Sequence, residues 1–149
     1  MQVKVDKKLA FKIVGKTYTL ENREQAKDIR DKFLEENKDI LKDQDTFFGL
    51  MEYNALDQNY KYFLGFEIKD KGLFDKNKFI SYEVPEGEYL EVPVDSEDGL
   101  KEGYRYTYEE YFPNKKYFHG IGPDIEAYKY DNGIKDVKLF ISLKENPHA

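Results

Sequence analysis

Apolar and polar residues alternate near the start of the chain in the way that is typical of a β-strand. Leu9, Phe11 and Ile13 occupy every second position of residues 9–15. Alternate side chains of a strand lie on one face, so these three residues would share a face of a first strand.

The hydrophobic period changes to a helical one after residue 20. Asn22 can accept a hydrogen bond at a helix N-terminus, and Gln25 lies three residues further on, which is the spacing of a capping box. Apolar residues then recur at near-helical spacing through about residue 41, at Ala26, Ile29, Phe33, Ile40 and Leu41. The sequence therefore predicts a helix with a solvated face of Lys, Asp and Glu.

Strand-like segments separated by turns occupy the middle of the chain. A polar turn at 56–59 and a charged loop at 70–77 separate the first of them, and Pro85-Glu-Gly87 predicts a hairpin-like corner between the last two. The predicted strands are residues 46–53, 60–68, 78–84 and 88–94.

A second helix is predicted from Asp95 or Ser96, either of which can cap it, to the helix-breaking Pro113. Its inner stripe is unusually aromatic and comprises Leu100, Tyr104, Tyr108 and Tyr111. Gly99 and Gly103 each weaken a helix by about 1 kcal/mol relative to Ala. Packing must therefore stabilise this helix.

Two further strands follow, at residues 125–130 and 137–143, with a turn at 131–133 between them and a loose tail from about residue 145. The element order of the first half, strand-helix-strand-strand, thus occurs again in the second half after a connecting strand. Two such repeats predict an α+β fold, in which a curved antiparallel sheet carries two main helices on one face and a central ligand groove where the halves meet. A length of 149 residues fits one domain spanning the whole chain.

Composition narrows the functional classes. The formal net charge of −6 argues against binding to a phosphate backbone as the main role. The chain has 13 Tyr and 11 Phe but no Trp. These rings fit either a tyrosine-rich core or a binding site walled by aromatic side chains, and composition alone leaves both open.

Several kinds of site are excluded by the sequence. With no cysteine there are no disulfides or thiolate ligands. The glycines at 120 and 122 are followed by a proline and a strand, which does not fit a dinucleotide fingerprint. His119 and His148 lack metal-ligand spacing. We therefore expect no metal and no cofactor. With no signal-peptide core and no apolar run near 20 residues, we expect a cytoplasmic protein that does not enter a membrane.

Glu126 is the most distinctive candidate for chemistry. On a strand, Glu126, Tyr128 and Tyr130 would point one way, and Ile125 and Ala127 the other. A carboxylate in line with two rings suits an organic cation, although an ordinary exposed Glu would show the same pattern.

The run Tyr108-Glu-Glu-Tyr111-Phe-Pro-Asn, followed by Gly122-Pro-Asp-Ile-Glu126-Ala-Tyr128, resembles the GyrI-like small-molecule-binding family. That family includes the effector-binding domains of AraC- and MerR-type multidrug-responsive activators, which share the SOUL-like fold. Pro85-Glu-Gly-Glu-Tyr89 is similar to the family's Pro-x-Gly-x-Tyr motif. The usual Trp of the first run is Tyr111 here, and the first half of the chain matches in element order alone.

The resemblance implies a stand-alone protein that captures cationic or polyaromatic compounds, with Glu126 paired to the cation and with no direct DNA binding. The ligand-binding residues expected around it are Tyr128, Tyr111, Phe112, Tyr104, Tyr53, Phe66 and Phe140.

Two other functions are implied by branches of the same family. One is a hydrolase that opens the ring of cyclopropanoid genotoxins, with Glu126 as general base and Tyr111 or Tyr128 as the donor to the developing oxyanion. The other is a gyrase-interacting protein, for which the acidic balance suits a basic partner.

Overall fold

One antiparallel sheet organises the structure, a computed structural model that describes residues 1–67, 77–114 and 116–148. Over these ranges the strand order is β1-β6-β9-β8-β3-β4-β2-β5, and the short β7 pairs with β9. The strands are β1 (Lys4–Lys8), β2 (Phe11–Leu20), β3 (Thr46–Asn54), β4 (Asn59–Glu67), β5 (Ile80–Val84), β6 (Gly87–Val92), β7 (Tyr117–His119), β8 (Asp124–Tyr130) and β9 (Ile134–Glu145).

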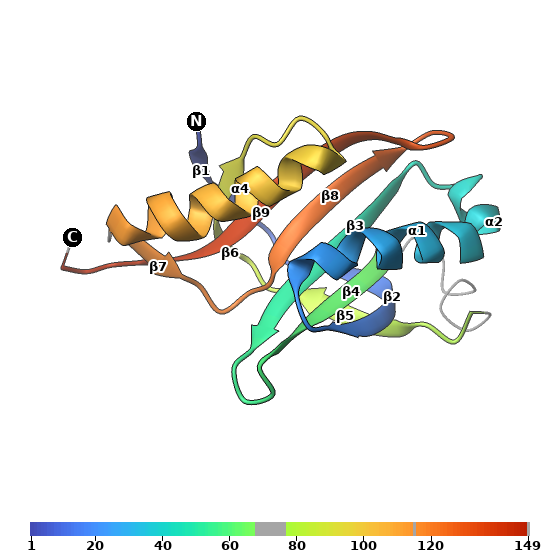
Figure 1. The fold of residues 1–149 in the computed structure, drawn as a ribbon, viewed down its shortest axis with the longest axis horizontal. Helices are drawn as coiled ribbons and strands as arrows, with labels where there is room; N and C mark the ends of the chain where they lie inside the picture. The colour runs from blue at the N-terminus through green and yellow to red at the C-terminus, as the bar shows by residue number, and fades with distance from the viewer. Residues whose placement is uncertain (68–76, 115, 149) are drawn as a thin grey trace.

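The predicted repeat is confirmed by the strand pairing. In the first half, β2, α1 (Ala26–Glu36), β3 and β4 form a unit whose strands are ordered β3-β4-β2, and in the second half β6, α4 (Leu100–Tyr106), β8 and β9 form one ordered β8-β9-β6. The two units join where β3 pairs with β8, at the centre of the sheet. Figure 1 shows α1 and α4 on the same face of the sheet, each over the strands of its own half.

Strands β1 and β5 are exchanged between the two units. β1 precedes β2 in sequence but pairs with β6, whereas β5 precedes β6 but pairs with β2. Each link has only two residues, 9–10 and 85–86. Three Cα–Cα steps span at most about 11 Å, so the sheet must curve strongly to bring its two ends together. The predicted hairpin-like corner at residues 85–87 is therefore wrong, because β5 pairs with β2, whereas β6 pairs with β1 and β9.

A second, smaller core fills the concave side of this curve. Ile13, Leu50, Phe63, Ile125 and Phe140 are buried together there. The main core lies on the other face, under the helices, where α1 buries Ala26, Arg30 and Phe33 and α4 buries Leu100, Gly103 and Tyr104.

The first helical segment begins as the sequence predicts. Asn22 Oδ1 accepts from the Gln25 amide at 3.3 Å, and the Gln25 side chain accepts from the Glu21 amide at 2.7 Å. A 3-10 turn, η1 (Arg23–Gln25), leads into α1, and a short α2 (Lys38–Leu41) follows it.

The second helix departs from regular α-helical geometry at its end. After the 3-10 turn η2 (Glu97–Gly99) and α4, the chain forms a π-helical turn, η3 (Thr107–Tyr111), and a last 3-10 turn, η4 (Phe112–Asn114). Gly103 allows the close approach of this helix to the sheet, because a Cβ atom there would lie 2.5 Å from Val94 Cγ1. The predicted end at Pro113 is confirmed.

Two strands are absent from the sequence prediction. The first predicted strand begins at Leu9, but the structure forms β1 before it and leaves Leu9 82% exposed in the link to β2. β1 carries one apolar residue among charges, and β7 is only three residues long, so neither has a detectable alternation. The charged loop predicted for 70–77 lies outside the described residues except for Asn77.

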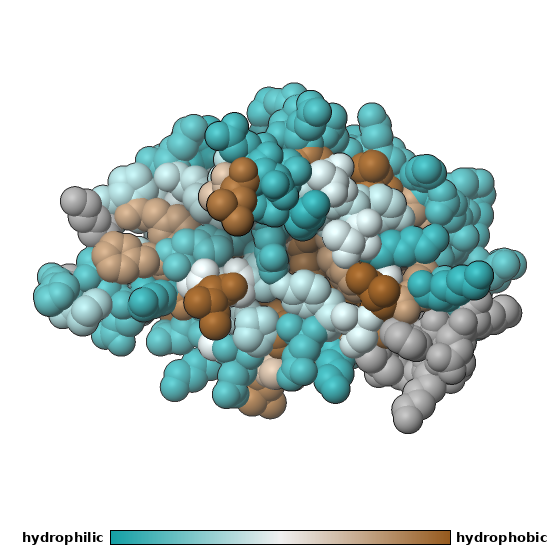
Figure 2. Space-filling model, turned by 90° about the horizontal axis from the view of Figure 1, so that it is seen from below, coloured by the Kyte–Doolittle hydropathy of each residue, from teal (hydrophilic) through white to brown (hydrophobic). Residues whose placement is uncertain are grey.

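None of the described helices combines the length and apolar character that crossing a membrane requires. Figure 2 shows exposed apolar side chains as separate spots among hydrophilic ones, not as one continuous patch on that face.

Candidate functional site

Glu126 lies at the seam between the two repeats. It is on the central strand β8, opposite Gly49 of β3 and Leu139 of β9. Its neighbours Ile125 and Ala127 face the smaller core, as the alternation predicts, so the carboxylate points to the helix-covered face. The side chain is only 1% exposed. Glu126 is therefore buried where the two halves meet, and the alternative of an ordinary exposed Glu does not hold.

Three phenols donate hydrogen bonds to this carboxylate. Tyr62 of β4 and Tyr128 of β8 donate to Oε1 at 2.5 and 2.7 Å, and Tyr104 of α4 donates to Oε2 at 2.5 Å. Burial, followed by the nearby charge of Glu126, raises the pKa values of all three phenols well above the ordinary value of 10. They therefore remain neutral donors, and charge-assisted hydrogen bonds of this kind stabilise the ionised carboxylate.

Arg30 of α1 supplies a cation to the same cluster. Its Nη1 lies 3.7 Å from Glu126 Oε1 and donates to Tyr62 Oη at 3.1 Å, while its Nε donates to Glu97 Oε2 at 2.9 Å. Burial alone would lower the pKa of Arg30, but the surrounding hydroxyl and carboxylate groups outweigh that effect and raise it. The guanidinium is therefore permanently charged and connects α1 to the start of the second helix above Glu126.

Gly49 creates the space in which this cluster is assembled. A Cβ atom added there would lie 2.7 Å from Tyr62 Oη and 2.8 Å from Glu126 Oε1. No heavy atom sits that close to a Cβ in a relaxed structure, so the absence of a side chain at this position is part of the site.

An inner hollow of about 560 Å³ opens between the helices over Glu126. Its lining includes Arg23, Arg30, Tyr60, Tyr104, Tyr108 and Glu126. Aromatic walls over an anionic floor are suited to an organic cation.

An outer hollow of about 570 Å³ lies beside it and has its own buried carboxylate, Asp124. Tyr108 donates to Asp124 Oδ2 at 2.5 Å, and His119 Nε2 lies 2.9 Å from Oδ1. Burial would lower the pKa of His119, but the hydrogen bond and charge of Asp124 outweigh it and raise the pKa above 6.5.

The structure brings together only part of the set of residues predicted from sequence. Glu126, Tyr128 and Tyr104 are in direct contact. Tyr53 is 57% exposed and lines the outer hollow, not the inner one.

Four predicted ligand-binding residues lie away from the Glu126 carboxylate. Phe140 is on the opposite face of the sheet because its partner across the β8–β9 pair is Ile125, not Glu126. Phe66 is fully buried against Phe33, with ring centroids 5.5 Å apart. Tyr111 and Phe112 are half-buried against each other at the end of the second helix, in and after the π-helical turn.

Three residues of the cluster have no place in the sequence prediction: Arg30, Tyr62 and Gly49. Arg30 nevertheless leaves a signal, because it lies four residues after Ala26 and three before Phe33 and so falls on the apolar face of the helix. Tyr62 alternates with Leu64 on a predicted strand, which places it on a buried face.

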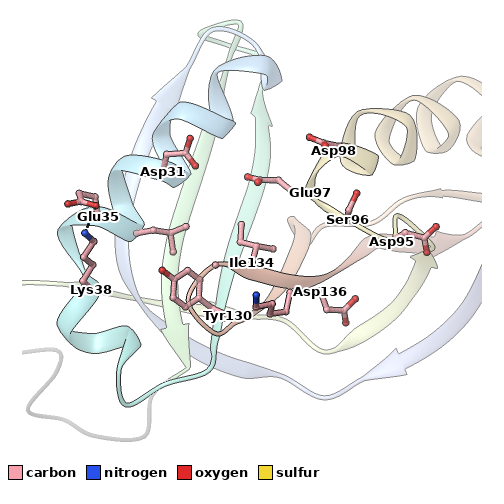
Figure 3. Close-up of a pocket in the computed structure, with 13 residues that line it drawn as sticks. Asp31, Glu35, Lys38, Asp95, Ser96, Glu97, Asp98, Tyr130, Ile134 and Asp136 are labelled. Atoms are coloured by element: carbon pink, nitrogen blue, oxygen red, sulfur yellow. Dashed lines mark ion pairs between the residues drawn. The ribbon is translucent and has the colours of Figure 1, made fainter.

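A third hollow of about 440 Å³ lies between α1, the segment before α4 and the β8–β9 hairpin. Figure 3 shows that many of its side chains are carboxylates, among them Asp31, Asp95, Asp98 and Asp136. Glu97 lines both this hollow and the inner one. In the described part of the chain, no three His, Asp or Glu side chains gather in a way that would hold a metal ion.

Comparisons with known proteins identify relatives of the fold. A structure of SAV2435 bound to tetraphenylphosphonium is similar, with a TM-score of 0.69, 14% identity and coverage of 97% of this chain and 94% of that one. The integron cassette protein VCH_CASS2, from the mobile metagenome of Vibrio cholerae, has a TM-score of 0.68 and 12% identity, with coverage of 95% of this chain and 95% of that one. The C-terminal domain of EcmrR has a TM-score of 0.64 and 9% identity, with coverage of 97% of this chain and 98% of that one.

A search of curated proteins finds no match. Similarity to solved structures at these identities establishes the fold alone. The family model that matches, over residues 4–143, is Cass2, described as integron-associated effector binding protein. The chain belongs to this family of effector-binding proteins.

Proposed function

We propose that the protein binds small organic cations with delocalised charge and aromatic substituents in the inner hollow over Glu126. The observation that carries this proposal is that the hollow already holds two guanidinium groups of the chain. Arg30 lies against the Glu126 carboxylate, and Arg23 lies among the rings of Tyr60, Tyr104 and Tyr108. A site that accommodates two such groups has the chemistry that a ligand of the same kind requires.

The carboxylates around Arg30 favour a cation in the hollow. Arg30 is shared by Glu97 and Glu126, so two carboxylates face this guanidinium, while the second guanidinium, that of Arg23, lies among the rings. Each contact between a cation and an aromatic ring contributes about 0.5–2 kcal/mol, more where water is excluded. SAV2435, which has this fold, was solved with tetraphenylphosphonium, and this cation is therefore the first probe to use.

The test compares tetraphenylphosphonium with tetraphenylborate, which has the same shape and the opposite charge. By isothermal titration calorimetry we expect the cation to bind and the anion to bind at least tenfold more weakly. Glu126→Gln should weaken the cation by about 10- to 100-fold, which corresponds to roughly 1.4–2.8 kcal/mol. Glu36→Gln is the matched control, because this exposed residue carries the same charge and is on α1 away from the hollow.

The double variant Arg30→Gln/Glu126→Gln guards against unfolding, since it removes both buried charges together. Equal affinity for the two tetraphenyl ions, or equal losses for the Glu36 and Glu126 variants, would refute the proposed charge pairing.

Hydrolysis of a bound compound is the weaker alternative. Both Glu126 oxygens accept hydrogen bonds from phenols, and these phenols are the donors that an oxyanion would need. Tyr111, the other donor implied by the family resemblance, is not among the described residues that line the hollow. The arrangement therefore favours binding over proton transfer.

A further inference from the structure

Arg23 has an unusual environment for an arginine. Its Cζ lies 4.6, 4.8 and 4.9 Å from the ring centroids of Tyr104, Tyr108 and Tyr60, which together we call the tyrosine cage. Its Nε is buried and has no hydrogen-bond partner, and no carboxylate of the described residues lies within ion-pair distance of it. An arginine normally satisfies several of its five N–H donors, so this guanidinium is held chiefly by rings.

The tyrosine cage lies above two carboxylates. Tyr104 and Tyr108 are four residues apart on the second helix, a rise of about 6 Å. Glu126 and Asp124 are two residues apart on β8, about 6.7 Å along the strand. These spacings match, and accordingly Tyr104 donates to Glu126 and Tyr108 to Asp124. Two buried anions beneath three rings make the cage favourable for a cation whichever molecule supplies it.

Arg23 also stands between the two hollows. Four residues line both: Arg23, Met51, Tyr60 and Tyr108. Of these, Arg23 has the longest side chain and is only half-buried, whereas Met51 is buried in the floor and the tyrosines form the walls. Withdrawal of the Arg23 side chain would join the inner and outer hollows into one groove that runs from Glu126 to Asp124.

We propose that Arg23 is a resident substitute for part of the ligand, and that the tyrosine cage is a second cation subsite for a guanidinium or quaternary ammonium group. A ligand that enters the cage displaces Arg23 into solvent, where its unpaired Nε–H group becomes hydrated. The groove then accepts an elongated cation that reaches from the inner to the outer hollow. The identity of the natural ligand as a cation rests on the proposed function, but the cage itself can be tested independently of it.

The first experiment empties the cage and offers it a small occupant. In Arg23→Ala, methylguanidinium should bind with a dissociation constant of about 1–10 mM and shift the ring signals of tyrosines in NMR spectra. Methylurea, which has a similar shape and no charge, should leave those signals unchanged. The wild-type protein should show no saturable shift with either compound, because Arg23 fills the cage.

The second experiment measures competition with a large cation. Arg23→Gln should bind tetraphenylphosphonium at least tenfold more tightly than wild type, a difference of about 1.4 kcal/mol. Lys32→Gln is the matched control for net charge, since Lys32 is an exposed residue of α1 that pairs with Glu36 and faces neither hollow. Its affinity should change less than threefold.

The outcomes separate the two proposals. Uptake of methylguanidinium by Arg23→Ala without binding of tetraphenylphosphonium by any variant supports the cage and refutes the proposed function. Binding of tetraphenylphosphonium that is unchanged or weakened in Arg23→Gln refutes displacement while the proposed function stands. Equal gains in affinity for tetraphenylphosphonium in the Arg23 and Lys32 variants would mean that net charge alone explains the effect, and this would refute displacement. Equal binding of methylguanidinium and methylurea would show that the cage does not select a cation.

Discussion

Replacing Gly49 with alanine tests the geometry of the Glu126 cluster with a single methyl group. The new Cβ atom would lie 2.7 Å from Tyr62 Oη and 2.8 Å from Glu126 Oε1, where ordinary contact begins at 3.4 Å. Both oxygens would have to retreat by about 0.6–0.7 Å in a region of crystal-like packing density. The Tyr62 hydroxyl has no free space, because Tyr62 is fully buried and bonded to Arg30 as well as to Glu126.

The size of the effect follows from this crowding. Overpacking a buried site costs about 1–3 kcal/mol. For a chain of this length, each kcal/mol lowers the melting temperature by roughly 2–4 °C, so Gly49→Ala should melt about 2–12 °C below wild type. Urea unfolding at constant pH gives the free energy directly. Gly87→Ala is the control, because a Cβ at Gly87 would have no neighbour within 4 Å, and its stability should stay within about 0.5 kcal/mol of wild type.

A double-mutant cycle identifies the colliding atom. Tyr62→Phe removes Oη, the nearest atom to the new methyl group. In that background Gly49→Ala should be less destabilising by at least 0.5 kcal/mol, roughly the lower limit for residues in contact. The reasoning fails if Gly49→Ala is as stable as Gly87→Ala, or if its cost is the same with and without the Tyr62 hydroxyl.

Two more predictions concern charges of the cluster and its neighbour. Arg30→Met leaves Glu126 buried without a cation and should lower the free energy of unfolding, measured in urea, by about 3–5 kcal/mol. A loss below about 1 kcal/mol would mean that the hydrogen bonds from the three phenols are enough to stabilise the buried carboxylate. His119 has a raised pKa, mainly because the hydrogen bond and charge of Asp124 outweigh burial, so its contribution to stability is complete below 6.5 and declines as the pH rises through the raised value. Unfolding free energies measured from about pH 6 to pH 9 should therefore fall for wild type relative to His119→Asn, and parallel curves would contradict the Asp124 contact.

The main architecture was accessible from sequence because its signals are local. The alternation around Ile13, the capping pair Asn22 and Gln25 and the helix stop at Pro113 each lie within a few residues, and all three correspond to observed elements. The exchange of β1 and β5 between the halves was not accessible, since pairing between distant strands leaves no trace in either segment alone. Residues 85–87 look like a hairpin turn because their composition is that of any short link.

The relative placement of two candidate site residues follows from the sequence because both lie on one strand. Glu126 and Tyr128 are two residues apart on β8, and the alternation that places them on one face is the same one that produces their hydrogen bond. Phe140 could not be placed without the register of β8 against β9, which decides the face. Tyr111 is seven residues beyond Tyr104, the helix residue that contacts Glu126, and therefore lies further along the second helix.

The partner of Glu126 could have been inferred by one further physical argument. A charged residue on the apolar face of a helix, or on the helix-covered face of a central strand, is buried at a high free-energy cost unless an opposite charge meets it. Arg30 is the cation on the apolar face of the first helix, and Glu126 is the anion between Ile125 and Ala127. The repeat places that helix over the face of the sheet to which the Glu126 side chain points. Two unmatched buried charges of opposite sign on facing elements therefore predict each other, and the 3.7 Å separation of Arg30 Nη1 and Glu126 Oε1 is the expected consequence.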